Sequence, residues 1–167
     1  MLSDKMHAAL NDQINAELHS AYIYLSMAAY FEDVNFAGMS GWMKAQAQEE
    51  VGHAMKFYGY IFDRGGTVEL KAIEGPQTKW DSPLVAFEAA YKHEQYITGR
   101  INKLMDMAAT DNDHATKSFL NWFVDEQVEE ESSVDAIVQR LKVVGDSKPG
   151  LFMLDRELGG RSAGGSE

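Results

Sequence analysis

The sequence has no cysteine among its 167 residues. It therefore cannot form a disulfide, use a thiolate as a nucleophile, or hold zinc or an iron–sulfur cluster through cysteine sulfur. Proline, the residue that interrupts helices most strongly, occurs only three times. These absences favour a fold of long helices over a disulfide-stabilised or thiol-dependent one.

Positive charge and long apolar runs are also scarce. Fifteen lysines and arginines face 26 acidic residues, which gives a formal net charge of −11. A nucleic-acid-binding protein needs a basic surface, so nucleic acid is not an expected partner, whereas the acidic excess suits a protein that binds cations. No apolar run approaches the roughly 18–20 residues of a membrane span, and residues 1–10 lack the apolar segment of a secretion signal. We therefore expect a cytoplasmic protein without membrane contact.

Residues that begin and end helices divide the chain into four long helical segments and a short fifth. The predicted helices cover roughly residues 3–33, 40–64, 83–110, 114–144 and 150–158. Ser3, Ser82 and Asp113 stand where helix N-caps are expected. Short links make helices one and two antiparallel, and likewise three and four, while residues 65–82 are long enough to cross the whole bundle. The predicted fold class is all-α, a four-helix bundle with a long crossover between helices two and three, a short fifth helix and a disordered tail at 159–167.

Two details of the predicted helices carry expectations about packing. Gly52 and Gly59 lie inside the second helix, where each costs up to about 1 kcal/mol, so we expect close packing at both. The fifth helix is too short to be stable alone. Its apolar side chains therefore need a packing partner, and we expect that partner in an oligomer; these side chains are Leu151, Phe152, Leu154 and Leu158.

Each long helix has an apolar stripe that is interrupted near its middle by residues able to bind a metal. The interruptions are Glu17 in the first helix, Glu50 and His53 in the second, Glu94 in the third, and Gln127 and Glu130 in the fourth. Counting residues from the helix ends places them at one depth, and the three-residue spacings put each pair on one helix face.

Four carboxylates at one depth of an apolar bundle repel one another and lose their hydration. Bound cations relieve both problems, and the negative charges match two divalent ions. Carboxylates with one imidazole suit iron, manganese or zinc. A lone glutamate on an apolar stripe usually reaches water, and a lone His53 would usually be structural, but neither explanation accounts for the whole set. Tyr24 is either a core aromatic or a hydrogen-bond partner of a ligand.

A second acidic group lies beside the first along the chain. Glu49 precedes Glu50, and Glu126 and Glu129 are one helical turn apart. The group is either a solvated acidic face or a neighbouring metal site.

The chain resembles the prokaryotic non-haem ferritins over about residues 6–158, so that residues 1–158 form one ferritin-like di-iron domain. The resemblance is carried by residues 10–17, 21–28, 48–55, 80–83 and 122–131. It implies a hollow 24-subunit cage that oxidises iron(II) with dioxygen or hydrogen peroxide and stores ferric oxyhydroxide. The fifth helix would then pack near the four-fold axes.

The same resemblance assigns roles to the candidate residues. The ferroxidase centre would comprise Glu17, Glu50, His53, Glu94, Gln127 and Glu130. Glu50 would bridge two irons; Glu17 and His53 would complete one site, and Glu94 and Glu130 the other. Gln127 would face bound oxygen or solvent, and Tyr24 would lie near the centre. A third iron site would fall on Glu49, Glu126, Glu129 and Glu130.

Other functions are left open by these residues. A bacterioferritin-like haem-containing cage would have a second Glu-x-x-His on the fourth helix and a haem-ligating methionine on the second. Here Gln127-Val-Glu-Glu130 and Val51 occupy those places, so no haem is expected. A di-iron oxidase or oxygenase would need a pocket for an organic substrate and a reductase. A purely structural bundle leaves the aligned carboxylates unexplained.

Overall fold

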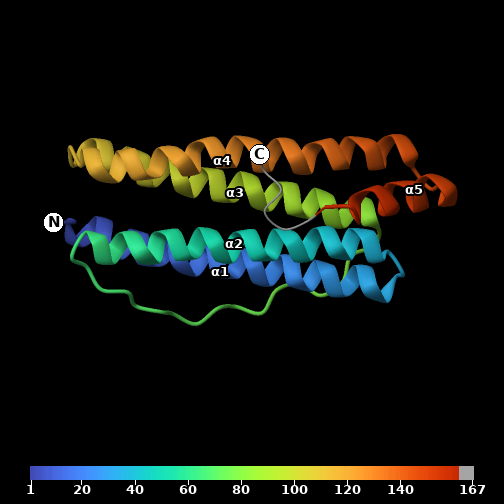
Figure 1. Cartoon of the computed structure of the whole chain (residues 1–167), viewed down its shortest axis with the longest axis horizontal. Helices are drawn as coiled ribbons and strands as arrows, with labels where there is room; N and C mark the ends of the chain where they lie inside the picture. The colour runs from blue at the N-terminus through green and yellow to red at the C-terminus, as the bar shows by residue number, and fades with distance from the viewer. Residues whose placement is uncertain (162–167) are drawn as a thin grey trace.

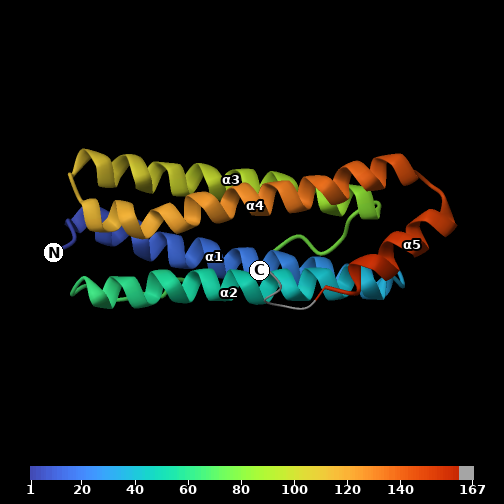
Figure 2. The same ribbon diagram turned by 45° about the horizontal axis from the view of Figure 1, so that its top comes forward.

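Five α-helices make up the computed structural model, which describes residues 1–161 (Figure 1). They are α1 (Asp4–Asp33), α2 (Ala37–Asp63), α3 (Pro83–Thr110), α4 (His114–Val144) and α5 (Lys148–Leu158). Helices α1 and α2 form one antiparallel hairpin, α3 and α4 form another, and the two hairpins lie side by side (Figure 2). The chain from 64 to 82 has no helix or strand and runs along the bundle to connect them. The predicted four-helix bundle, its crossover and its short fifth helix are confirmed.

Three helix starts agree with the predicted N-caps. The side chains of Ser3, Ser82 and Asp113 each accept a hydrogen bond from the backbone N–H three residues later. Asp113 is also held by Arg64, whose two terminal nitrogens lie 3.0 and 3.1 Å from its carboxylate oxygens. These starts were readable from sequence because each cap is a short-range contact.

The starts of α2 and α5 were predicted too late, by three and two residues. Helix α5 begins at Lys148 because the Ser147 hydroxyl accepts from the Gly150 N–H at 3.2 Å. Helix α2 has no side-chain cap of its own at Phe36. Instead the carboxylate of Asp155, on α5, accepts from the Met39 N–H at 2.8 Å. The cap of α2 is thus a tertiary contact between residues 116 positions apart in the sequence, and no local sequence pattern predicts it.

A glycine lets the two helices approach closely at this contact. A Cβ on Gly38 would lie 1.7 Å from the Asp155 carbonyl oxygen, a distance no side chain tolerates. By contrast, the predicted close packing at Gly52 and Gly59 is wrong within the chain. Nothing lies within 4 Å of a Cβ built at either position, because both face outward.

Helix α5 finds much of its packing partner within the same chain. Leu154 and Leu158 are buried and belong to the apolar core, and Leu151 is partly buried against it. Phe152 and Met153 remain 66% and 71% exposed. The prediction that all four apolar residues of α5 need an external partner is therefore wrong for Leu154 and Leu158.

The apolar core consists of two clusters separated by a polar layer. One cluster includes Tyr24, Ala47, Ala90 and Val134, and extends toward α5. The other includes Ile14, Ala54, Ile97 and Phe123, and extends toward the opposite end of the bundle. In every long helix the residues between the two clusters are the predicted metal-binding ones.

The end of the chain is described only in part. Of the predicted disordered tail, 159–167, the structure describes Gly159–Arg161, and the Arg161 side chain contacts α2. Residues 162–167 lie outside the described residues. Within 1–161, no helix combines the length and apolar character of a membrane span.

Removing the interhelical cap should loosen α2 and α5 together. Asp155→Ala is expected to destabilise the protein by about 1 kcal/mol, the usual cost of losing an N-cap acceptor. Asp155→Asn keeps an acceptor oxygen and should lose less. Thermal unfolding of the metal-free protein measures both, and equal melting temperatures for Asp155→Ala and wild type would contradict the assignment.

Candidate metal centre

The predicted ligands from the four long helices meet in the layer between the two apolar clusters. Each is at most 5% exposed: Glu17, Glu50, His53, Glu94, Gln127 and Glu130. They share this depth because antiparallel helices of similar length bring their midpoints level. The alignment predicted by counting residues is therefore present in the structure.

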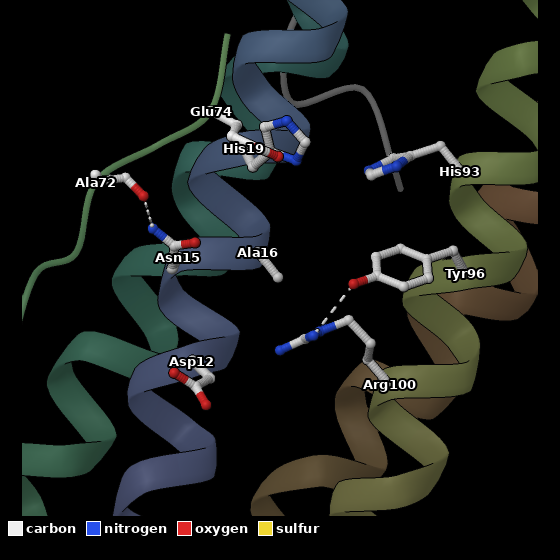
Figure 3. A pocket seen from close by; sticks show the side chains of 9 residues that line it. All are labelled: Asp12, Asn15, Ala16, His19, Ala72, Glu74, His93, Tyr96 and Arg100. Carbon is white, nitrogen blue, oxygen red and sulfur yellow. Dashed lines mark hydrogen bonds between the residues drawn. The ribbon is translucent and has the colours of Figure 1, made fainter. Parts of the chain in front are cut away.

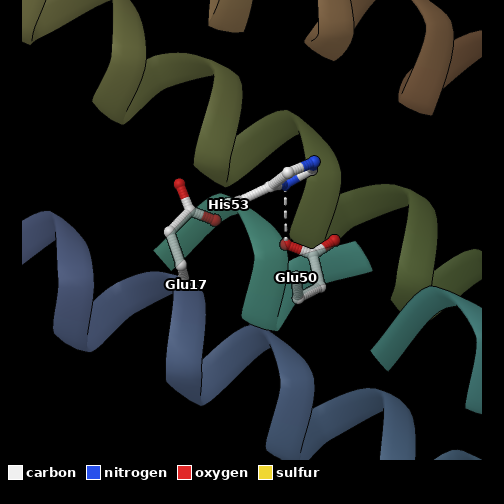
Figure 4. Close-up of side chains that lie close together, drawn as sticks. All are labelled: Glu17, Glu50 and His53. Carbon is white, nitrogen blue, oxygen red and sulfur yellow. Dashed lines mark ion pairs between the residues drawn. The ribbon is translucent and has the colours of Figure 1, made fainter. Parts of the chain in front are cut away.

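Glu17, Glu50 and His53 form the first group of converging ligand atoms. One atom from each lies within 4.8 Å of the other two. Glu17 comes from α1, while Glu50 and His53 lie one turn apart on α2, and the three side chains turn toward one another (Figure 4). The His53 Nδ1 lies 3.3 Å from a Glu50 oxygen. Two carboxylates and an imidazole at this spacing can coordinate one cation.

Two buried glutamines donate hydrogen bonds to the carboxylates of Glu17, Glu50 and Glu130. Gln13 donates to a Glu17 oxygen at 2.7 Å. Gln46 donates to Glu130 at 2.6 Å and to Glu50 at 3.3 Å. Sequence reasoning missed both glutamines. Their position four residues before Glu17 and Glu50, on the same helix face, was the available signal.

An arginine fixes the orientation of each glutamine amide. The Arg100 Nε donates to the Gln13 side-chain oxygen at 2.9 Å, and an Arg161 terminal nitrogen donates to the Gln46 side-chain oxygen at 3.0 Å. Because each amide oxygen faces a guanidinium, each amide N–H₂ faces a carboxylate. Neither arginine carries a sequence signal for this role, since the contacts span 87 and 115 residues.

Glu94 is held by different partners. The Tyr24 hydroxyl donates to one of its carboxylate oxygens, and the Gln127 amide donates to the other at 3.2 Å. Gln127 also donates to the Glu94 backbone carbonyl and to the Thr98 hydroxyl, both at 3.3 Å. Tyr24 is thus both a core aromatic and a hydrogen-bond partner of a candidate ligand.

Glu94 belongs to neither group of three converging ligand residues found within 1–161. The predicted pairing of Glu94 with Glu130 around a second ion stays a prediction. Without a cation, Glu94 and Glu50 repel each other, and hydrogen-bond donors take up both Glu94 oxygens. Gln127 likewise points its N–H₂ at Glu94 instead of into open space, which differs from the predicted orientation.

Two carboxylate oxygens in the layer have no hydrogen-bond partner. They are the Glu17 Oε2 and the Glu130 Oε1, both buried. An unsatisfied buried polar atom costs about 1–3 kcal/mol, and more when it is charged. A cation bound at each of the two groups would satisfy the oxygen in that group, so the donor set fits metal ions.

Burial shifts the protonation of the layer toward neutral acids. It raises the pKa of Glu17, and burial together with the charge of Glu94 raises that of Glu50 well above its usual range. Burial raises the pKa of Glu94 to about 7. Burial and the charge of Glu94 raise the pKa of Glu130 to about 8. Near neutral pH, the metal-free centre therefore holds protons that a cation would displace.

His53 responds in the opposite sense. Burial alone would lower its pKa, but hydrogen bonds to Glu126 and Glu50 and the surrounding negative charge raise it to about 11. The imidazolium thus neutralises part of the carboxylate charge when no metal is present. A metal ion at this position would replace that proton.

The second acidic group is assembled only in part. One atom each of His53, Glu126 and Glu130 lie within 4.8 Å of one another, with the His53 Nε2 3.8 Å from Glu126. Glu49 is ion-paired with Arg161 at 2.7 Å and Glu129 is exposed, so neither joins this group. Of the four residues predicted for a third site, the structure brings together two, and it adds His53.

A separate cavity of about 490 Å³ lies between α1, α3 and the crossover (Figure 3). It contains His19 and His93, but neither belongs to a group of converging ligand atoms in the described chain. The His93 Nε2 lies 2.7 Å from the Ser20 hydroxyl, and burial and the charge of His19 lower the His93 pKa to about 4. None of the six buried candidate ligands lines this cavity.

Several known proteins are similar to this chain. The family model described as Ferritin-like domain matches residues 7–144. The chain is 44% identical over 161 residues to the bacterial non-heme ferritin of Bacteroides fragilis strain 638R, covering 96% of this chain and 100% of that protein. It is 43% identical over 162 residues to the bacterial non-heme ferritin of Staphylococcus haemolyticus, covering 97% and 98%.

The solved structures give the same result. The chain is similar to a crystal structure of an open pore ferritin from the hyperthermophilic archaeon Archaeoglobus fulgidus, with a TM-score of 0.96 and 51% sequence identity. That match covers 97% of this chain and 100% of the archaeal one.

The raised pKa values predict how the stability of the metal-free protein depends on pH. A carboxyl whose pKa is higher in the folded protein stabilises the fold below its unfolded pKa of 4.5, and that contribution is lost as pH rises through about 7 for Glu94 and about 8 for Glu130. His53 acts in the same direction, between its unfolded pKa of 6.5 and about 11. The melting temperature in the presence of a chelator should therefore fall between pH 6 and pH 9.

The variant Glu130→Gln provides the control for this pH dependence. It cannot titrate at this position, so its melting temperature should fall less steeply over the same range. A wild-type melting temperature that rises from pH 6 to pH 9 would contradict the assignment.

Proposed function

The chain belongs to the ferritin family, and we propose that it oxidises iron(II) at the buried carboxylate–histidine layer and stores the ferric product inside a cage of 24 subunits. Iron storage follows from the family. The oxidation step, its residues and the cage are the finer parts of the proposal.

The observation that carries the proposal is the group of Glu17, Glu50 and His53 inside an otherwise apolar bundle. The unpartnered Glu17 oxygen supports it, because a fold that needed only packing would gain nothing from this buried atom. A structural bundle is therefore the weaker explanation.

Each ligand contributes to oxidation through charge and geometry. Carboxylates bind iron(III) more strongly than iron(II), so Glu17 and Glu50 make the bound iron(II) easier to oxidise. Two iron(II) ions would together supply two electrons to dioxygen or hydrogen peroxide. Glu50 lies between Glu17 and Glu130, joined to the latter through Gln46, and is suited to bridge two ions.

The other half of the layer must rearrange to bind the second ion. Glu94 would exchange its hydrogen bonds from Tyr24 and Gln127 for a metal ligand. Glu94 and Glu130 would release their protons, because their pKa values of about 7 and about 8 leave them partly protonated near neutral pH. Tyr24 and Gln127 would then be the donors nearest to the oxidant.

We keep the third iron site within the proposal, with Glu126 and Glu130 as its core and Glu49 and Glu129 as ligands that must move in. The support is the second group of converging atoms, which already contains Glu126 and Glu130. Its location beside the centre suits transfer of iron onward.

We also propose that this cage carries no haem. Val51, at the place predicted for a haem-ligating methionine, is 44% exposed on α2 and has no atom that can bind iron. The cytoplasmic location remains a prediction.

An oxidase acting on an organic substrate is the second candidate function. It shares the same ligands, so the metal-binding residues alone do not separate the two. The two functions differ in their product. Only a ferritin oxidises more iron than its binding sites hold and collects it as a mineral inside the particle.

Loss of a central ligand should abolish the fast phase of iron(II) oxidation. Glu50→Ala and His53→Ala each remove a ligand, so the initial rate should fall by more than the roughly 10–100-fold that loss of a supporting residue costs. Stopped-flow absorbance after mixing with aerobic iron(II) is the measurement. Glu88→Gln and His114→Ala change a half-buried glutamate and an exposed histidine outside the layer, and both should leave the rate unchanged.

The stability of the same variants distinguishes a lost ligand from a lost fold. Glu50→Ala removes a buried carboxyl group that loses its hydration in the apolar bundle, so the variant should keep or raise the melting temperature of the metal-free protein. Wild-type oxidation rates in both Glu50→Ala and His53→Ala would disprove the assigned centre.

A cage should be visible as a large particle in solution. Phe152 and Met153 remain exposed on α5 and are available for contacts between subunits. Sedimentation velocity at micromolar concentration should show a species far larger than the 18.6 kDa chain. A single 18.6 kDa species under several salt conditions would exclude the cage.

A further inference from the structure

Arg161 places a permanent positive charge on the second acidic group. One of its terminal nitrogens lies 2.7 Å from the Glu49 carboxylate, and the other donates to the Gln46 amide oxygen at 3.0 Å. The guanidinium also lies over the Trp42 ring, 4.6 Å from its centroid. Three separate contacts, all to α2, hold this one side chain.

These contacts connect Arg161 to both sides of the acidic group. Directly, Arg161 neutralises Glu49, which is absent from the converging group of His53, Glu126 and Glu130. Indirectly, it orients Gln46, whose N–H₂ donates to Glu130 at 2.6 Å. The one guanidinium therefore controls one member of the predicted third site and positions another.

We propose that Arg161 is a built-in competitor of the metal ion at this acidic group, and that the group takes a cation through Glu49 only when the arginine moves away. The competition follows from charge, because a guanidinium and a divalent ion neutralise the same carboxylate and cannot both occupy its inner face. Arginine stays protonated at every physiological pH, so the competitor is always present.

The surrounding chain allows Arg161 to leave. Gly159 and Gly160 separate it from α5, and glycine permits backbone rotations that other residues resist. The side chain can therefore swing off Glu49 while Leu154 and Leu158 keep α5 packed. The side chains of Arg161 and Glu49 are 25% and 24% exposed, so solvent reaches the ion pair and screens it in part.

Arg100 provides a comparison, because it orients a glutamine as Arg161 does. It orients Gln13 through the same amide contact, but no ion pair joins it to a carboxylate in the described part of the chain. It supports the geometry of Glu17 without occupying a metal ligand. Arg161 makes both contacts, and the ion pair with Glu49 is the one that a cation must break.

Anaerobic calorimetric titration with cobalt(II) provides the test, because no oxidant is present and only binding is measured. The binding phase that is lost in Glu126→Gln is the one that belongs to the second acidic group. In Arg161→Gln that phase should tighten about five-fold, the size expected for release of a partly exposed ion pair. Arg156→Gln removes an exposed arginine from α5 and should leave the phase unchanged.

Two further variants separate competition from packing. Arg161→Lys keeps the charge and should stay within about two-fold of wild type. In the double variant Arg161→Gln/Glu49→Gln the gain in cobalt(II) affinity should be absent, because the Glu49 carboxylate for which the arginine and the ion compete has been removed. The proposal is overturned if Arg161→Gln binds cobalt(II) with unchanged or weaker affinity, whether or not its melting temperature falls. It is also overturned if Arg156→Gln or Arg161→Lys gains as much affinity as Arg161→Gln.

The inference rests on the proposed function for the third site, to which Glu49 would belong, and for naming iron as the ion. Cobalt binding is independent of iron oxidation, so the two can fail separately. A protein that shows the Arg161 effect with cobalt but no aerobic iron(II) oxidation would refute the proposed function and leave the competition standing.

Discussion

The burial of several carboxylates in one layer of an apolar bundle is the constraint on which the rest of this structure depends. Each buried charge loses its hydration, and neighbouring charges repel. Short chains of hydrogen bonds, the His53 imidazolium and protons retained on Glu94 and Glu130 lower the free-energy cost of this burial. Part of the cost remains, since one oxygen of Glu17 and one of Glu130 have no hydrogen-bond partner. The remaining cost favours the binding of a cation.

The two apolar clusters make this layer possible. They lie on either side of it and pack the four helices together, and the candidate ligands between them are at most 5% exposed. The layer is asymmetric. Glu17, Glu50 and His53 converge from the α1–α2 hairpin, whereas Glu94 belongs to the α3–α4 hairpin and turns to Tyr24 and Gln127.

Amide side chains link the layer to charges outside it. Gln13 and Gln46 each present an oxygen to an arginine and an N–H₂ to a carboxylate. In this way Arg100 and Arg161 influence the buried carboxylates without entering the layer. Arg161 differs because its ion pair with Glu49 places it where a cation would bind. The end of the chain is thus connected to the chemistry of the centre, and α5, which carries it, is docked through Asp155 on the start of α2.

The sequence by itself determined most of the fold and which residues form the buried polar layer. Helix caps such as Ser82 and Asp113 are local, and the interruptions at Glu17, Glu50, Glu94 and Glu130 repeat at matched depths, so both could be read without coordinates. Tertiary structure alone decided the start of α2, because its cap comes from Asp155. It also decided which candidate ligands converge, since Glu17, Glu50 and His53 form one group while Glu94 is hydrogen-bonded to Tyr24 and Gln127. The contacts of Arg100 and Arg161 join residues about a hundred positions apart, and no periodic pattern encodes a pairing at that separation.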